Sequence, residues 1–178
     1  MKFRLLLAIA CLNTGLLCAA DVRTATGKNI DLASYKTYEW LPIRVLTKTG
    51  VVENDDHYAP LIRRAINKQM PRTGLKEVKS GGDLQVMVAA LKDADAQLEA
   101  IIYAYGYDLN YGFFGTSPIA TIGHYNFEGT VVVNLYDAKL KKGAWLALGK
   151  NKIKRPEQLE GVVDKIANKM FDKYPLKK

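Results

Sequence analysis

A long β-branched run in the C-terminal half constrains the fold of this chain more than any other feature. Residues 124–137 include the sequence TVVVNL at 130–135, a composition typical of a strand. Lys141-Lys142-Gly143 supplies a turn, and the apolar run 144–149 predicts an antiparallel return strand. A third stretch, 83–91, alternates at first and then becomes wholly apolar, as in a central strand. The sequence therefore predicts a sheet that contains long, well-buried strands.

Two other segments have the periodicity of amphipathic helices. In the first, Asn54-Asp55-Asp56 offers helix caps, and apolar residues recur at helical spacing from Tyr58 to Met70. Pro71 and Gly74 close this segment. In the second, Pro156 opens a stripe that continues through residues 159–170, and Pro175 ends it. We expect both helices to bury one face.

The remaining segments are shorter and less regular. Residues 35–40 predict a strand with Tyr38 and Trp40 on one face, ended by Leu41-Pro42. Residues 24–29 are a polar stretch, 43–54 are predicted as a loop, and 75–78 as a short strand. Residues 96–103 fit either a strand or a helical turn. The predicted fold class is α+β, an antiparallel-rich sheet with two amphipathic helices packed on one face, in a single domain over residues 21–178.

The first twenty residues have the composition of a secretory signal peptide. Lys2 and Arg4 precede an apolar run over residues 5–17, and Ala20 ends a small-residue cleavage site. Both cysteines, Cys11 and Cys18, lie in this leader, so cleavage after Ala20 leaves a chain without thiols or disulfides. The predicted location is periplasmic or secreted.

Acylation of a leader cysteine is the alternative. Small residues precede Cys11, but the apolar run before it is short for an exported leader, and the bulky Leu17 precedes Cys18. Lipidation at Cys11 or Cys18 would make the protein an outer-membrane lipoprotein and is the condition under which we expect membrane association.

The chain is basic, with a formal net charge of +8 that falls to +6 when Lys2 and Arg4 leave with the leader. The basic residues are spread along the chain, which favours a solvated basic face over attraction to anionic envelope surfaces at low salt. No recognition helix or RNA-binding signature is visible, and nucleic acid is not an expected partner. Local clusters occur at Arg63-Arg64, Lys139-Lys141-Lys142, residues 150–155 and Lys177-Lys178.

Several pieces in this order resemble a known family. They are the leader, YKTYEW at 35–40, the first helix, GDLQV at 82–86, EGTVVVNLYD at 128–137, Trp145 and the C-terminal helix. Together they are similar to the bacterial envelope family called domain of unknown function 4136, over about residues 30–175. The resemblance implies an exported, often lipid-anchored α+β domain, with no established activity and no catalytic residues. The chain departs from that pattern in its poor acylation box and in the spacing between Trp145 and Gly149.

Few residues suggest catalysis or metal binding. His57 is next to two aspartates at a helix start, where we expect the aspartates to cap the helix, and His124 is expected at the surface or in a loop. The acidic cluster Asp93, Asp95 and Glu99 lacks the glycine and late glutamate of a calcium loop. Neither a nucleophile elbow nor a phosphate-binding loop is present in the sequence, so no catalytic residue, metal ligand or cofactor is predicted. The carboxylates that a hydrolase would use are Asp83, Asp108, Glu128 and Asp137, which we expect mostly in turns.

The Tyr/Gly-rich segment 103–115 supplies the candidate binding residues. Aromatic faces stack on sugar rings or on partner side chains, and glycines allow a close approach of the backbone. The alternative is an irregular loop whose rings fold back onto the sheet. The candidate ligand-binding residues are Tyr105, Tyr107, Tyr111, Phe113 and Phe114.

These features predict a non-enzymatic binding or assembly module of the bacterial envelope, with an unknown envelope protein or glycan as partner. The alternatives are a carboxylate-using envelope hydrolase and an outer-membrane-tethered lipoprotein.

Overall fold

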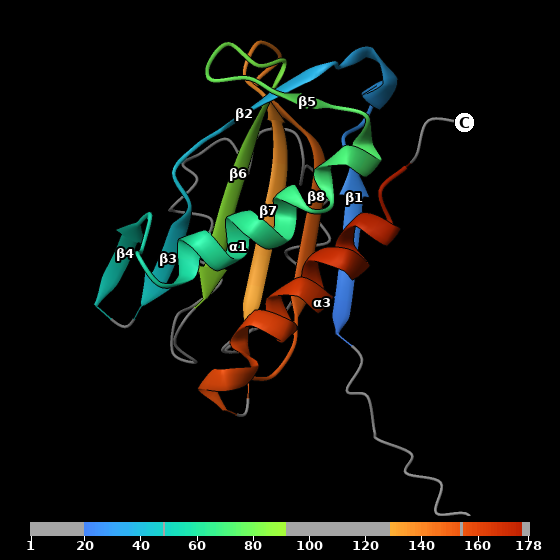
Figure 1. Ribbon diagram of the computed structural model, residues 1–178. Helices are drawn as coiled ribbons and strands as arrows, with labels where there is room; N and C mark the ends of the chain where they lie inside the picture. Colours follow the sequence, from blue (N-terminus) through green and yellow to red (C-terminus); the bar gives the residue numbers. More distant parts are fainter. Residues whose placement is uncertain (1–19, 48, 92–128, 154, 176–178) are drawn as a thin grey trace, which may run out of the picture.

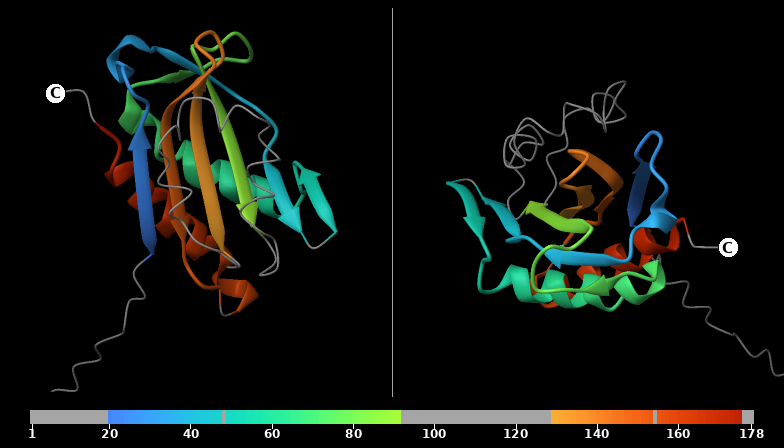
Figure 2. Two further views of the ribbon diagram at one scale, coloured as in Figure 1. Left: turned by 180° about the vertical axis from the view of Figure 1, so that it is seen from behind. Right: turned by 90° about the horizontal axis from the view of Figure 1, so that it is seen from above.

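The computed structural model describes residues 20–47, 49–91, 129–153 and 155–175. Two helices cover one face of an eight-stranded mixed sheet (Figures 1 and 2). The path through the sheet is β1-β8-β7-β6-β2-β5, and β3 joins β6 to the edge strand β4. The α+β class and the antiparallel-rich sheet are as predicted. No helix in the described ranges is long and apolar enough to cross a membrane.

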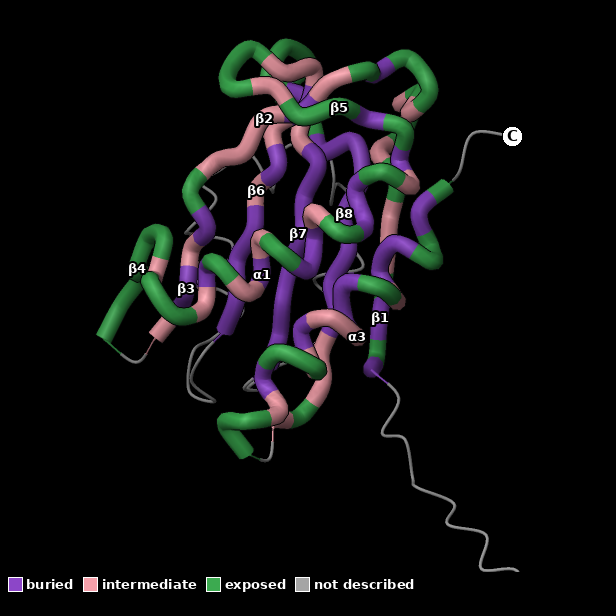
Figure 3. The backbone as a smooth tube through the Cα atoms, in the orientation of Figure 1, coloured by how far each residue is buried: buried purple, intermediate pink, exposed green. Residues whose placement is uncertain are grey.

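The centre of the sheet is antiparallel. Strands β6 (Leu84–Leu91), β7 (Thr130–Asp137) and β8 (Lys142–Lys150) lie side by side, and β7 and β8 form the predicted hairpin. The alternating β-branched and apolar residues of these strands are buried almost throughout (Figure 3). On the other side of β8, strand β1 (Asp21–Thr26) pairs antiparallel along its whole length.

The pairing on the far edge of β6 was not predicted. Strands β2 (Thr37–Trp40) and β3 (Arg44–Thr47) both run parallel to β6, β2 beside its first half and β3 beside its second half. Pro42 lies between these two strands. Proline has no backbone N–H to donate to a neighbouring strand, so the pairing with β6 is interrupted at this point. Proline therefore interrupts this edge of the sheet instead of ending it.

One of our segment predictions is wrong. Residues 43–54 were predicted as a loop but hold a hairpin of β3 and β4 (Gly50–Glu53), in which Val45 and Leu46 are fully buried. The polar stretch 24–29, to which no secondary structure was assigned from the sequence, belongs in part to β1. In both cases pairing with a neighbouring strand outweighs weak local propensity. The two-residue strand β5 (Lys76–Glu77) runs parallel to β2 on the side away from β6, and β1 forms the opposite edge of the sheet.

The helices lie where their apolar stripes predict. Helix α1 (Tyr58–Asn67) leads into a 3₁₀ turn (Met70–Thr73), and helix α3 (Leu159–Asp172) follows another (Pro156–Gln158). A third 3₁₀ turn, Leu32–Ser34, precedes β2. Both helices pack on the same face of the sheet (Figure 2). Helix α3 lies over β8, where Trp145 contacts Phe171 and Tyr174 at ring-centroid distances of 5.3 and 5.1 Å.

Charged side chains join the outer surfaces of the two helices. Arg64 of α1 binds Glu160 and Asp164 of α3, and Arg72 binds Asp172 at 2.7 Å. The acidic partners recur along one stripe of α3, and their order matches the order of the arginines along the first helix. The pairs therefore require the two helices to run in parallel.

Candidate functional site

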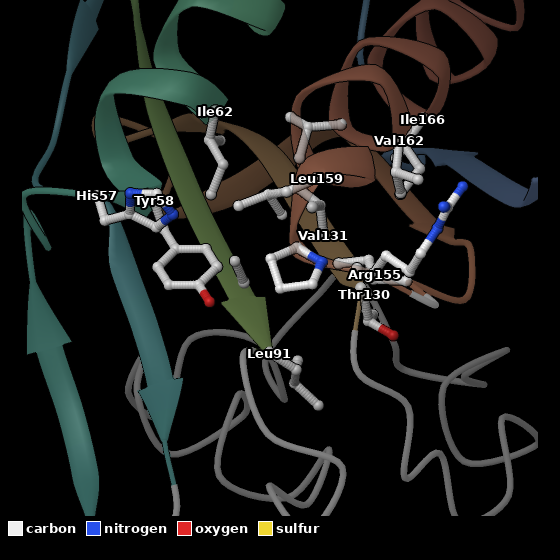
Figure 4. A pocket seen from close by; sticks show the side chains of 15 residues that line it. His57, Tyr58, Ile62, Leu91, Thr130, Val131, Arg155, Leu159, Val162 and Ile166 are labelled. Atoms are coloured by element: carbon white, nitrogen blue, oxygen red, sulfur yellow. The ribbon is translucent and has the colours of Figure 1, made fainter.

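A pocket of about 190 Å³ opens between the start of α1, the start of α3 and one end of the central strands. Figure 4 shows His57 and Tyr58 on its α1 side and Arg155 on its α3 side, with Leu91 and Thr130 at the strand ends. The helical stripes reach this pocket because both helices begin at the end of the sheet where β6 finishes and β7 starts (Figure 1).

Buried apolar side chains form the inner walls of the pocket. Ile62 and Ile166 face it from the two helices and are each 1% exposed. Ala90 and Val131 form its floor on the sheet, each 5% exposed. Alanine fills less space than the branched residues around it, so the small Ala90 side chain leaves part of the pocket unfilled. The other apolar lining residues are Leu91, Ile153, Pro156, Leu159, Val162 and Val163.

Polar groups are confined to the rim and the strand ends. The Asp55 carboxylate accepts hydrogen bonds from the backbone nitrogens of His57 (3.0 Å) and Tyr58 (2.9 Å), which confirms the predicted capping for Asp55. The His57 ring then lies edge-on to Tyr58, with centroids 5.0 Å apart. Arg155 is exposed and ends the loop before α3. The rim therefore combines one guanidinium, one imidazole and one phenol.

The chemistry of this site favours binding. Pockets for drug-sized ligands are roughly 300–1,000 Å³, whereas an apolar cavity of about 150 Å³ holds a benzene ring. The hollow beside α1 and α3 therefore fits one aromatic ring or one branched aliphatic group. Within the described ranges no three His, Cys, Asp or Glu side chains are placed to hold a metal ion.

Two of the carboxylates considered for hydrolysis lie at the opposite end of the sheet. The Asp83 carboxylate accepts hydrogen bonds from the backbone nitrogens of Lys36 (2.8 Å) and Thr37 (2.9 Å), which lower its pKa below the ordinary value. Asp137 is 5% exposed and accepts a hydrogen bond from the Tyr35 hydroxyl at 2.9 Å. Burial, and then this carboxylate, raise the pKa of Tyr35.

The second oxygen of Asp137 holds a turn. Its Oδ1 accepts hydrogen bonds from the backbone nitrogens of Lys139 (2.8 Å) and Leu140 (2.9 Å). Asp137 is therefore a turn residue, as predicted, whereas Asp83 joins the start of β2 to the start of β6, and internal donors engage both carboxylates.

The other candidate residues lie outside the described ranges. These are the aromatic candidates Tyr105, Tyr107, Tyr111, Phe113 and Phe114, the carboxylates Asp108 and Glu128, His124, and the cluster Asp93, Asp95 and Glu99. The predicted binding role of the Tyr/Gly segment stays a prediction.

The sequence did not indicate the pocket. The walls of the pocket are formed by the same apolar residues whose spacing predicts the helices. This spacing indicates which residues are buried, but it does not give the distance between side chains of different elements. The one visible signal is that both helical stripes begin beside polar caps and a proline, at residues 55–60 and 155–159.

Comparison with known proteins agrees with this fold. The profile of the family described as Domain of unknown function (DUF4136) matches residues 22–176, nearly all of the chain after residue 20. The chain belongs to the DUF4136 family. No curated protein matches it.

Solved structures share the fold of this DUF4136 domain at low identity. A DUF4136 family protein from Bacteroides thetaiotaomicron has a TM-score of 0.59 at 13% identity, and the match covers 88% of this chain and 96% of that one. A PDZ domain protein from Parabacteroides distasonis has a TM-score of 0.54 at 15% identity over 90% of this chain and 37% of that one. The PelC dodecamer from Paraburkholderia phytofirmans has a TM-score of 0.49 at 11% identity over 89% of this chain and 99% of that one. At these identities the first two matches concern the fold alone, and no conclusion is drawn from the third.

Proposed function

We propose that this DUF4136 domain is an exported bacterial envelope protein that acts by binding, and that its pocket receives one apolar group of an envelope partner. The observation that carries this proposal is the combination of buried apolar walls with a polar rim at the α1–α3 pocket. An apolar ring or branched chain that enters this pocket leaves water.

The position of the carboxylates supports binding over hydrolysis. Asp83 and Asp137 lie at the other end of β6 and β7 from the pocket, and backbone amides or a hydroxyl engage their oxygens. A general acid or base must reach the substrate and exchange a proton with it. No described residue combines a pocket position with a carboxylate side chain.

Export is supported by the composition of the leader and by the position of β1. The strand begins at Asp21, directly after the predicted cleavage site, so removal of residues 1–20 leaves the β1–β8 ladder complete.

A small apolar probe tests whether the pocket binds. We expect 4-fluorotoluene to bind saturably in ¹⁹F NMR titrations of the purified protein, and Val162→Phe, which fills the mouth, to weaken this binding at least tenfold. Val52→Phe is the matched control, since Val52 is 41% exposed on β4 and does not line the pocket. Absence of saturable binding, or equal binding by Val162→Phe, would show that the pocket is not a binding site.

A second experiment tests the envelope partner. The photo-crosslinker p-benzoylphenylalanine is placed at position 58 on the rim or at position 52 as a control, and intact cells are irradiated. We expect a discrete crosslinked product from position 58 that disappears when Val162→Phe is added. A product that persists in the filled variant would refute the proposed role of the pocket.

A further inference from the structure

The end of the molecule opposite the pocket is rich in lysine. Three segments meet there: residues 27–36, residues 76–83 and the β7–β8 turn (Figure 1). The Tyr35–Asp137 and Lys36–Asp83 hydrogen bonds join them, and the backbone nitrogen of Gly27 donates to Ala144 at 3.0 Å. We call this surface the lysine end, defined by the exposed residues Lys28, Lys36, Lys76, Lys79, Lys139, Lys141 and Lys142.

Among the described residues, the carboxylates of the lysine end form no ion pair with these lysines, although Lys139 lies near enough to Asp83 to help lower the pKa of that carboxyl. Glu39, for example, accepts hydrogen bonds from the Gly81 amide at 2.7 Å and from Gln85 Nε2 at 2.9 Å, which lower its pKa. The carboxylates held in this way by backbone amides or by neutral side chains are Asp31, Glu39, Glu77, Asp83 and Asp137.

The lysine ammonium groups are consequently available to an external anion. Among the described residues, none of the seven forms an ion pair, although Lys36 Nζ donates to the backbone oxygen of Ala33 at 3.1 Å. By contrast, arginines of the helical layer and Lys150 at the other end are paired with carboxylates. The acids of this end stabilise its turns, and its positive charge is left facing the solvent.

A large apolar side chain projects from the same surface. Leu140 is 55% exposed and lies between Lys139 and Lys141 in the β7–β8 turn. Asp137 fixes the turn by accepting from the Leu140 backbone nitrogen. The other large apolar side chains exposed in the described ranges, Val51 and Val52, lie on β4, away from this end.

We propose that the lysine end docks on a membrane surface containing anionic phospholipid, with Leu140 entering the headgroup region. Lysines near such a surface each contribute about 1 kcal/mol of attraction, equivalent to about fivefold in affinity. An apolar side chain ringed by lysines suits an interface that is anionic outside and apolar beneath, whereas a soluble polyanion offers no apolar layer for Leu140. This site is separate from the α1–α3 pocket and does not depend on its role.

The experiment is co-sedimentation of the processed protein, purified from the envelope, with vesicles. Vesicles of pure phosphatidylcholine are compared with vesicles containing one-third phosphatidylglycerol. We expect the anionic vesicles to bind the protein more tightly, and the excess to vanish as salt rises from roughly 0.05 to 0.5 M. The neutral vesicles measure any contribution from an acyl anchor, which acts equally on both compositions.

Variants assign the binding to the lysine end. Lys139→Gln with Lys142→Gln should lower affinity for anionic vesicles about 25-fold, from fivefold for each lysine. The matched control, Lys68→Gln with Lys152→Gln, removes the same charge elsewhere, since Lys68 reaches Asp164 on the helical layer and Lys152 follows β8 at the pocket end. Leu140→Ser should weaken binding about fivefold through lost apolar burial, and Val51→Ser should not. Circular dichroism spectra of all variants confirm folding.

Three results would overturn the proposal. The first is equal binding to neutral and anionic vesicles at low salt. The second is an equal loss in the lysine-end variant and in its charge-matched control. The third is salt-sensitive binding to a soluble anionic polysaccharide that is lost with Lys139→Gln and Lys142→Gln and is indifferent to Leu140→Ser, which would assign the surface to a glycan.

Discussion

Single polar side chains set the conformation of the turns in this domain. Asp83 accepts hydrogen bonds from the backbone nitrogens of Lys36 and Thr37, more than forty residues earlier in the chain, and the Asp83 nitrogen donates back to Thr37 Oγ1 at 3.0 Å. This reciprocal pair holds the start of β2 against the start of β6. The carboxylate form is favoured because backbone N–H groups point at it.

The lowered pKa of Asp83 predicts a contribution to stability that depends on pH. Its folded-state pKa lies below its unfolded value of about 3.9, so the contribution is complete above that value and is lost as pH falls through the folded-state pKa. Asp83→Asn keeps an acceptor but removes the charge, and should lower the free energy of unfolding by about 1 kcal/mol at neutral pH. Urea unfolding between neutral and acid pH measures this difference, which should shrink below pH 4. The control Glu157→Gln, at an exposed site, should leave the free energy of unfolding unchanged at both neutral and acid pH.

Tyr35 and Asp137 form the buried counterpart of this interaction. Tyr35→Phe leaves Asp137 Oδ2 without its hydroxyl donor in a nearly buried setting, and should cost about 1.5–3 kcal/mol of unfolding free energy. Tyr174→Phe is the control, since Tyr174 is equally buried and forms no hydrogen bond through its hydroxyl among the described residues. Equal losses for the two variants in urea titrations would contradict a specific role for the Tyr35–Asp137 bond.

Close packing between α3 and β8 sets the geometry at the scale of elements. A Cβ atom at Gly149 would lie 2.5 Å from Ile166 Cγ2 and 2.9 Å from Met170 Cε, so glycine allows the helix to approach the strand. Trp145 then packs on Phe171 and Tyr174 from the same strand. The ion pairs between the first helical segment and α3 are exposed, so they contribute little to the free energy of unfolding. They act mainly by favouring the parallel orientation of the two helices.

Substitution by alanine should have opposite effects on stability at two glycines, one in β8 and one in α3. Gly149→Ala forces α3 away from β8 and should destabilise the domain by about 1–3 kcal/mol. Gly161→Ala, in the exposed first half of α3 with open space around it, should stabilise the domain by about 0.5–1 kcal/mol through helix propensity. Thermal unfolding by differential scanning calorimetry checks both. Destabilisation by Gly161→Ala would show that the solvent face of α3 contacts something else.

At the scale of the whole molecule, charge and apolar surface are separated along the strands of the sheet. The pocket lies where β6 ends and β7 begins, and the lysine end lies where β6 begins and β7 ends. Strand β1 starts at the pocket end, next to Lys150, which pairs with Asp21 at 3.5 Å. Ala20, the last residue of the predicted leader, therefore lies at the end of the domain opposite the lysine end.

The position of β1 predicts the form that the protein takes after the proposed export. Ala20 is 7% exposed and its carbonyl oxygen accepts from Lys169 Nζ, while the ladder itself begins at Asp21. Cleavage after Ala20 should therefore cost one side-chain contact and leave the sheet intact. We expect intact mass spectrometry of the protein from its envelope to show a chain that starts at Asp21 and lacks cysteine. Its unfolding midpoint should then be unaffected by reductant. A lipid-modified mass starting at Cys11 or Cys18 would contradict this prediction.

The sequence by itself determined the local structure of this protein. Periodicity of 3.6 residues located α1 and α3, the β-branched run and its turn located the β7–β8 hairpin, and aspartates at turns and caps were identified as such. These features depend on neighbours a few residues apart, so a single chain segment contains the information. The pattern of YKTYEW and EGTVVVNLYD also indicated the DUF4136 family.

Only the tertiary structure decided how these elements meet. The parallel placement of β2 and β3 on β6 depends on partners more than forty residues away, and weakly patterned strands such as β1 and β4 exist because a neighbour offers a ladder. The pocket forms where the apolar faces of α1, α3 and the sheet do not fill the space between them. The local sequence pattern specifies that these residues are buried, but not how far apart the elements lie. The tertiary structure also decided which groups engage the acids of the lysine end, because their partners, such as Tyr35 for Asp137 and the backbone nitrogen of Lys36 for Asp83, lie far away in the sequence.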